Sequence, residues 1–198
     1  MLRRHRFVPV IFGAALAIGL LSAPAHANTI TITAHTLMDG MTEVPPVNTP
    51  ATGEATITIV GDILTVDEDW SGLIGGNAGA AHIHCCSDPG TNVGVAVGFP
   101  GFPAAASGSY FHVFDLTDPA IYTAAFRNGF GGGTAAGAEA ALIEGILAGR
   151  AYVNIHNTQF GGGEIRGQLV GQIVPEPATL TLFGLGLAGA AIRRRIRH

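Results

Sequence analysis

The chain has no lysine, only two cysteines and one tryptophan, and charged residues make up just 12% of its 198 residues. Residues 28–174 hold three arginines and thirteen acidic residues, so the central segment is acidic. Such a segment repels the phosphates of nucleic acid, so nucleic acid is not expected as a partner, whereas metal ions and other cations fit. Glycine is abundant, at 29 residues, which suits a turn-rich all-β protein or a membrane-associated one.

The first 27 residues have the organisation of a secretory signal peptide. Three arginines within the first six residues precede an apolar run over residues 7–21, and Ala25 and Ala27 form a small-residue cleavage site. We therefore expect signal peptidase to cleave after Ala27, so that the mature chain works outside the cytoplasm. The alternative is that the apolar run stays as an uncleaved membrane anchor.

Alternating apolar and polar residues predict antiparallel strands within residues 28–173, which we expect to form one domain. A tight turn at Gly61 joins two such strands, over residues 53–60 and 63–73, into a hairpin. Trp70 is expected to cap the core at the end of the second strand. The pattern predicts a Greek-key-like antiparallel β-sandwich.

One or two short helices are expected in a connection between strands. Asp118 and Pro119 are typical of a helix start, which predicts a helix as far as about residue 126. The alanine-rich residues 135–148 predict a second helix that ends at Gly149. These helices should cover one end of the sandwich.

Histidines supply the sharpest candidate for chemistry. His82, His84 and Cys86 fall on one face of the strand over residues 81–86, because strand side chains alternate, and we expect that face to be polar and exposed. His156 on a later strand can add a third imidazole, and three imidazoles, with Cys86 as a further soft ligand, suit copper or zinc. The alternative is that these histidines are structural and hydrogen-bond to turns and neighbouring strands.

The two cysteines are adjacent, and three interpretations stay open. Cys85 and Cys86 can form a vicinal disulfide in a distorted turn, they can be free thiols, or Cys86 can be a metal ligand beside His82 and His84. Export to an oxidising compartment favours the disulfide.

The remaining charged residues show no catalytic constellation, so no enzymatic activity is predicted. Glu164 and Arg166 share a strand face and are expected to form a surface ion pair rather than an acid/base pair. The acidic run over residues 67–69 could bind calcium, although a solvated strand end is favoured.

Four segments together resemble a known family. They are His-Ile-His at residues 82–84, Tyr-Val-Asn-Ile-His at 152–156, Gly-Gly-Glu-Ile-Arg-Gly-Gln-Leu at 162–169 and Glu-Val-Pro-Pro-Val at 43–47. This set is similar to the CHRD domain, a module named from chordin and found in many exported bacterial proteins. The resemblance covers roughly residues 29–171 and implies an immunoglobulin-like or Cu/Zn-superoxide-dismutase-like sandwich, with no single biochemical function attached.

The His-x-His pattern is itself similar to the copper strand of Cu/Zn superoxide dismutases. That family needs six histidines and an aspartate, whereas residues 28–174 offer five histidines and no histidine-rich zinc loop. Dismutase activity is therefore not expected. The five are His35, His82, His84, His112 and His156.

The last segment, residues 174–198, has the features of a sorting signal. An apolar run over residues 178–192 lies between a Pro-Glu-Pro motif and an arginine cluster, and basic residues after an apolar helix predict a transmembrane helix with a cytoplasmic end. The flanking residues are Val174, Pro175, Glu176, Pro177, Arg193, Arg194 and Arg195. The segment resembles a PEP-CTERM signal, which implies retention in the inner membrane until an exosortase cleaves near the motif; an ordinary tail anchor is the alternative.

The sequence thus favours an exported, non-enzymatic protein of the cell envelope or extracellular matrix. Its expected partners are signal peptidase, an exosortase-type enzyme, the inner membrane, and extracellular polysaccharide or surface proteins. The alternative is a copper- or zinc-binding metalloprotein, or a small redox enzyme, that uses the strand histidines.

Overall fold

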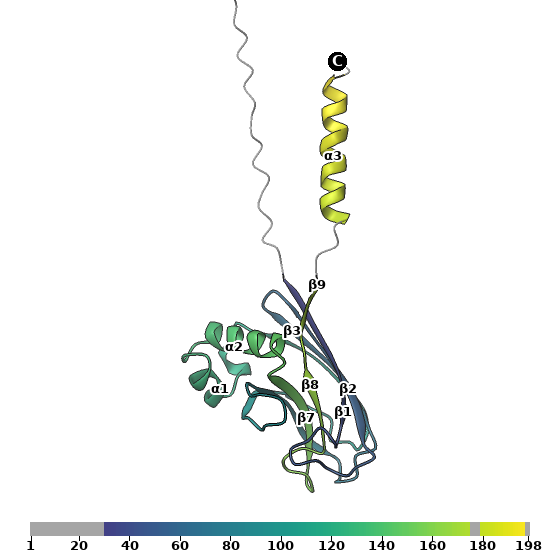
Figure 1. Cartoon of the computed structure of the whole chain (residues 1–198). Helices are drawn as coiled ribbons and strands as arrows, with labels where there is room; N and C mark the ends of the chain where they lie inside the picture. The colour runs from purple at the N-terminus through teal and green to yellow at the C-terminus, as the bar shows by residue number, and fades with distance from the viewer. Residues whose placement is uncertain (1–29, 175–178, 197–198) are drawn as a thin grey trace, which may run out of the picture.

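The computed structural model describes residues 30–174 and 179–196 (Figure 1). The predicted signal peptide, residues 1–27, and residues 175–177 of the sorting segment lie outside the described residues. The strands of the described part are β1 (Thr31–Asp39), β2 (Thr52–Val60), β3 (Ile63–Ser71), β4 (Ala78–Cys85), β5 (Val95–Gly98), β6 (Gly108–Asp115), β7 (Ala151–Asn157), β8 (Ile165–Leu169) and β9 (Gln172–Val174). The helices are α1 (Ala124–Gly129), α2 (Ala135–Leu147) and α3 (Thr179–Ile196), with a 3-10 turn at Pro119–Ile121.

The strands form one antiparallel sheet in the order β5-β4-β7-β8-β1-β2-β3-β6, with β9 added on β1. The sheet curls, so that the first four strands of this order and the last four enclose the apolar core between them (Figure 1). The layers are joined where Asp39 of β1 pairs with Arg166 of β8. The edge strands meet on the other side, where the ring of Phe99, just after β5, stacks on Tyr110 of β6 at 5.2 Å. The all-β antiparallel prediction is confirmed.

The β2–β3 hairpin follows directly from the sequence pattern. Its inward side chains, among them Ile57 and Leu64, are almost fully buried, and the tight turn between the strands holds Gly61 at φ 58°. Only glycine adopts that backbone conformation without a steric cost. Trp70 is 3% exposed at the end of β3, as predicted, and its ring stacks on Phe102.

Helix α2 closes one end of the curled sheet. Thr134 caps its N-terminus by accepting a hydrogen bond from the Gly137 N–H, and Gly149, at φ 68°, follows its end. The predicted helix over residues 135–148 is thus confirmed. The earlier one is split, because Asp118 caps only the 3-10 turn and α1 begins later at its own cap, Thr123.

The first and last strands of the sheet lie side by side, since Thr31 of β1 pairs with Val174 of β9. The C-terminal helix expected from the sequence is present as α3. Within residues 30–174 and 179–196, we find no helix whose length and apolar character would suffice to cross a membrane.

Candidate metal centre

A polar layer lies on the outer face of β4, β7 and β8, opposite the apolar core. On β7, Val153 and Ile155 belong to the core, whereas Tyr152, Asn154 and His156 alternate with them and point outward. Loops before β2, after β4 and before β8 cover this face, so that even Asn154 is only 1% exposed. The sequence interpretation placed the histidines on an exposed face, and the structure covers much of this face because the loops fold back over the sheet.

His82, His84 and His156 meet within this layer. One ring nitrogen of each lies within 4.8 Å of the other two, and the ring centroids of His82 and His156 are 4.9 Å apart. His82 and His84 share a face of β4, as the alternation predicted, but His84 is only 7% exposed and the other two are partly buried. The expectation of exposed imidazoles is therefore wrong.

Backbone carbonyls fix which nitrogen of two rings carries the proton. The Nδ1 atom of His84 lies 2.8 Å from the carbonyl oxygen of Val93, and Nδ1 of His156 lies 3.0 Å from that of Gly161. A carbonyl oxygen only accepts, so in the neutral ring Nδ1–H donates and Nε2 keeps its lone pair. His84 Nε2, His156 Nε2 and His82 Nδ1 are all buried and have no hydrogen-bond partner among the described residues.

The same burial keeps the cluster neutral. Removal from water lowers the pKa of His82 to about 4, with a further contribution from the nearby His156 and His84. Burial also lowers the pKa of His84 to about 4 and lowers the pKa of His156. All three rings are therefore uncharged at neutral pH, which is the form that binds metal ions.

Tyr152 supports this cluster from the neighbouring strand. Its ring stacks on that of His84 at 4.6 Å between centroids, and its hydroxyl donates a hydrogen bond to the Val93 carbonyl at 3.3 Å. The guanidinium carbon of Arg166, on the strand at the other side of β7, lies 3.7 Å from the centre of the Tyr152 ring. Tyr152 thus connects the histidines to the ionic network described next.

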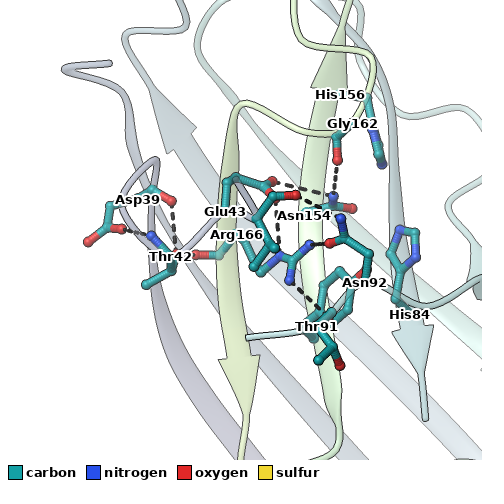
Figure 2. Close-up of polar contacts among 12 residues, drawn as sticks. Asp39, Thr42, Glu43, His84, Thr91, Asn92, Asn154, His156, Gly162 and Arg166 are labelled. Carbon is teal, nitrogen blue, oxygen red and sulfur yellow. Dashed lines mark hydrogen bonds and ion pairs between the residues drawn. The ribbon is translucent and has the colours of Figure 1, made fainter. Parts of the chain in front are cut away.

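Arg166 is the centre of a buried ionic network, shown in Figure 2. Its Nε donates to the Glu43 carboxylate at 3.1 Å, and both side chains are no more than 3% exposed. The rest of the guanidinium donates to the Asn92 side chain and, at 3.4 Å, to the Thr91 carbonyl. Asn154 donates to the other oxygen of Glu43 at 3.4 Å.

A glycine in the turn before β8 makes room for this network. Gly163 has φ 124°, and a Cβ atom added there would lie 2.0 Å from the Glu43 carboxylate and 2.6 Å from the Asn154 amide. The glycine-rich turn of the sequence therefore serves the close approach of Glu43 to β7 and β8 as well as the turn itself.

The surface ion pair predicted between Glu164 and Arg166 is wrong. Glu164 is fully buried and accepts hydrogen bonds from the backbone N–H groups of Ile74 and Gly75 and from the side chains of Thr49 and Asn157. Burial alone would raise the pKa of Glu164, but these donors outweigh it and lower the pKa. Glu164 and Arg166 therefore do not pair with each other, because the loops before β2, after β3 and after β4, together with Asn157 of β7, supply their partners.

The structure does not bring Cys86 to the histidines. Its sulfur is bonded to that of Cys85, and both sulfurs face Gly145 of α2, where an added Cβ would lie 2.2 Å from Cys85 Sγ and 2.6 Å from Cys86 Sγ. The pair therefore lies against α2, at the core side of β4, and Cys86 is not available as a fourth ligand.

The acidic run of β3 does not form a cation site either. Asp67 and Asp69 are exposed on one face, whereas Glu68 points into the core, is 0% exposed, and has no hydrogen-bond partner among the described residues for either oxygen. Strand alternation separates the three carboxylates, so neither the calcium site nor a fully solvated strand end is correct.

Sequence reasoning found the three histidines but missed their supporting residues. Tyr152, Asn154, Glu43 and Arg166 all stood in the segments that carry the family resemblance, yet their mutual contacts span up to 123 positions of sequence. The signal available was Glu43 in an otherwise uncharged motif and Arg166 in a motif whose only other charged residue is Glu164.

Comparison with known proteins agrees with this architecture. The family model of the CHRD domain matches residues 34–169, and that of the PEP-CTERM protein-sorting motif matches residues 174–195. Searches of the curated proteins and of the solved structures find no match. The sorting motif implies export and membrane-associated sorting by an exosortase-type system. Because the first match spans more than half of the sequence, the chain belongs to the CHRD domain family and carries a PEP-CTERM sorting motif directly after its last strand.

Proposed function

We propose that the protein is an exported, non-enzymatic binding module that holds one copper or zinc ion between His82, His84 and His156. The observation that carries the proposal is the meeting of three histidines, with one ring nitrogen of each within 4.8 Å of the other two, in which every ring also has a buried nitrogen without a hydrogen-bond partner among the described residues. A buried polar atom left unpaired costs about 1–3 kcal/mol. Three such atoms side by side are poorly explained as structural histidines and well explained as ligands.

The residues around the three histidines also suit a metal ion. Metal-binding imidazoles commonly donate their other N–H to a carbonyl, and Val93 and Gly161 accept such hydrogen bonds from His84 and His156. Metal–nitrogen bonds of about 2.0–2.1 Å require the three atoms to approach one another more closely than the 4.8 Å limit that encloses them now.

The burial of the ligand atoms supports binding rather than catalysis. Because the three nitrogens are buried, access of a substrate to an ion at the centre of the cluster would be limited. Of the three histidines, His82 alone borders a cleft of about 710 Å³ between β5 and β6, which offers a route for the ion. We assign the exported module to the cell surface or extracellular matrix, with polysaccharide or surface proteins as its partners.

Elemental analysis of the purified full chain tests the metal site. We expect about one equivalent of copper or zinc in the wild type, its loss in His84→Ala, and its retention in His35→Ala, which removes an exposed strand histidine outside the cluster. Wild-type protein without stoichiometric metal, after incubation with either ion, would contradict the proposal. Turnover of superoxide by the loaded chain at an enzymatic rate would contradict the non-enzymatic role.

Intact mass of the protein from its native host tests the sorting route. Cleavage after Ala27 and removal of the tail near Val174 each change the mass by a defined amount. A species that keeps both segments would contradict export and processing.

A further inference from the structure

We infer that the ion at this site is copper in the monovalent state. The inference rests on the proposed metal site and adds the identity and charge of the ion. It depends on three features of the cluster: the charge of its ligands, their number, and the rigidity of their support.

The ligand set carries no negative charge. The cluster contains three imidazoles and no carboxylate, and the nearby ionic side chains, Glu43 and Arg166, are already paired with each other. An ion placed there keeps its full charge in a buried environment. The cost of burying an ion grows with the square of its charge, so a divalent ion pays about four times the desolvation cost of a monovalent one. Neutral ligands in a buried site therefore favour the monovalent ion.

The number of ligands points the same way. Zinc held by three imidazoles takes a water or another ligand in a fourth position, and divalent copper prefers a tetragonal arrangement of at least four ligands. The three histidines bring three nitrogen donors together, and Cys86, the fourth ligand suggested by the sequence, is bonded to Cys85 and faces α2. The three nitrogens are themselves buried, so a water that completed the shell would have to enter from the cleft that His82 borders. Monovalent copper has a filled d shell and is satisfied by three donors in a plane.

The support of the rings opposes a rearrangement toward higher coordination. His84 is held by the Val93 carbonyl at its Nδ1 atom and by the face of Tyr152, and His156 is held by the Gly161 carbonyl. Tyr152 is itself pressed between His84 and Arg166. A ligand whose orientation is fixed in this way keeps the geometry that suits one ion and excludes others.

Competition titrations of the full chain test the assignment. Monovalent copper is supplied anaerobically as its bicinchoninate complex, and zinc and divalent copper are supplied in separate titrations with a chromophoric chelator. We expect one equivalent of monovalent copper, bound on the order of 100-fold or more tightly than zinc, and no electron paramagnetic resonance signal from the anaerobic complex. His84→Ala and His156→Ala should lose this binding, and His35→Ala should retain it, with circular dichroism confirming that each variant is folded.

The outcomes separate the inference from the proposal beneath it. Zinc or divalent copper bound as tightly as monovalent copper, with the same dependence on His84 and His156, would overturn the assignment of the ion and leave the metal site standing. No binding of any of the three ions would overturn the metal site itself.

Discussion

The ring of Tyr152 lies parallel to the ring of His84, with 4.6 Å between centroids and 5° between planes. Both residues also contact the same carbonyl oxygen, that of Val93, through the Tyr152 hydroxyl and through His84 Nδ1. One aromatic side chain therefore fixes both the plane of the imidazole and the loop that determines its protonation. This makes Tyr152 a positioning residue for the proposed metal site.

Replacing Tyr152 should weaken metal binding without removing a ligand. Tyr152→Ala loses the stacking and the hydroxyl, and we expect about a 10- to 100-fold loss of metal affinity, as is usual for residues that orient a ligand. Tyr152→Phe keeps the ring and should lose much less. The competition titration measures both affinities. Equal affinities in the wild type and in folded Tyr152→Ala would show that the stacking has no role in binding.

The buried ion pair between Glu43 and Arg166 should be strongly sensitive to substitution. Glu43→Gln leaves the Arg166 charge buried without a counter-charge, and we expect the free energy of unfolding to fall by about 3–5 kcal/mol. Urea denaturation of the full chain measures this change. The matched control is Glu54→Gln, which removes an exposed pair with His35 and should cost less than about 1 kcal/mol. Similar losses in the two variants would contradict a special role for the buried pair.

Glu68 should make the fold less stable as the pH rises. Burial raises the pKa of Glu68 from 4.5 to about 8, with a smaller contribution from the charge of Asp69. Between these two values the folded chain keeps a proton that the unfolded chain has lost, so the free energy of unfolding falls with increasing pH and levels off above about pH 8.

Removing this carboxyl tests the effect. Glu68→Gln cannot titrate, so its stability relative to the wild type should increase from pH 5 to pH 8, by a few kcal/mol at most, since one pKa unit corresponds to about 1.4 kcal/mol. Urea denaturation at a series of pH values measures the difference, with Glu54→Gln as the exposed control. A wild-type minus variant difference that stays constant across this range would contradict the raised pKa.

Gly145 should not tolerate a side chain. A Cβ atom at this position would overlap both sulfurs of the Cys85–Cys86 disulfide, so Gly145→Ala forces α2 away from β4. Overpacking of this kind costs about 1–3 kcal/mol, although alanine is the better helix former. Thermal unfolding should show a lower midpoint for this variant. Gly94→Ala, where an added Cβ meets nothing within 4 Å, is the control and should behave like the wild type.

The sequence pattern correctly predicted the elements whose formation depends on neighbouring residues. The β2–β3 hairpin and α2 follow from alternation, capping residues and turn glycines, and both appear within a few residues of their expected bounds. The pairing of His82 with His84 on one face also follows from strand geometry.

Burial of the polar face could not be predicted in the same way. Whether Arg166 meets Glu164, two residues away, or Glu43, on a distant loop, depends on how three loops fold over the sheet, and alternation contains no information about that. The same loops cover the face that was expected to be exposed, and they therefore shield the histidines from solvent. The prediction for Glu68 failed for a related reason. Its charge suggests a position in solvent, whereas the alternation of β3 directs its side chain into the core.

Val174 is both the final residue of β9 and the first residue of the matched sorting motif, and it pairs with Thr31 at the beginning of β1. No spacer therefore separates the folded body from the peptide that the sorting machinery reads. An enzyme that recognises this peptide must therefore bind it next to the hydrogen-bonded strands β1 and β9. The beginning and the end of the domain therefore lie at the same end of the sheet, and the loops at the opposite end point away from the sorting motif (Figure 1).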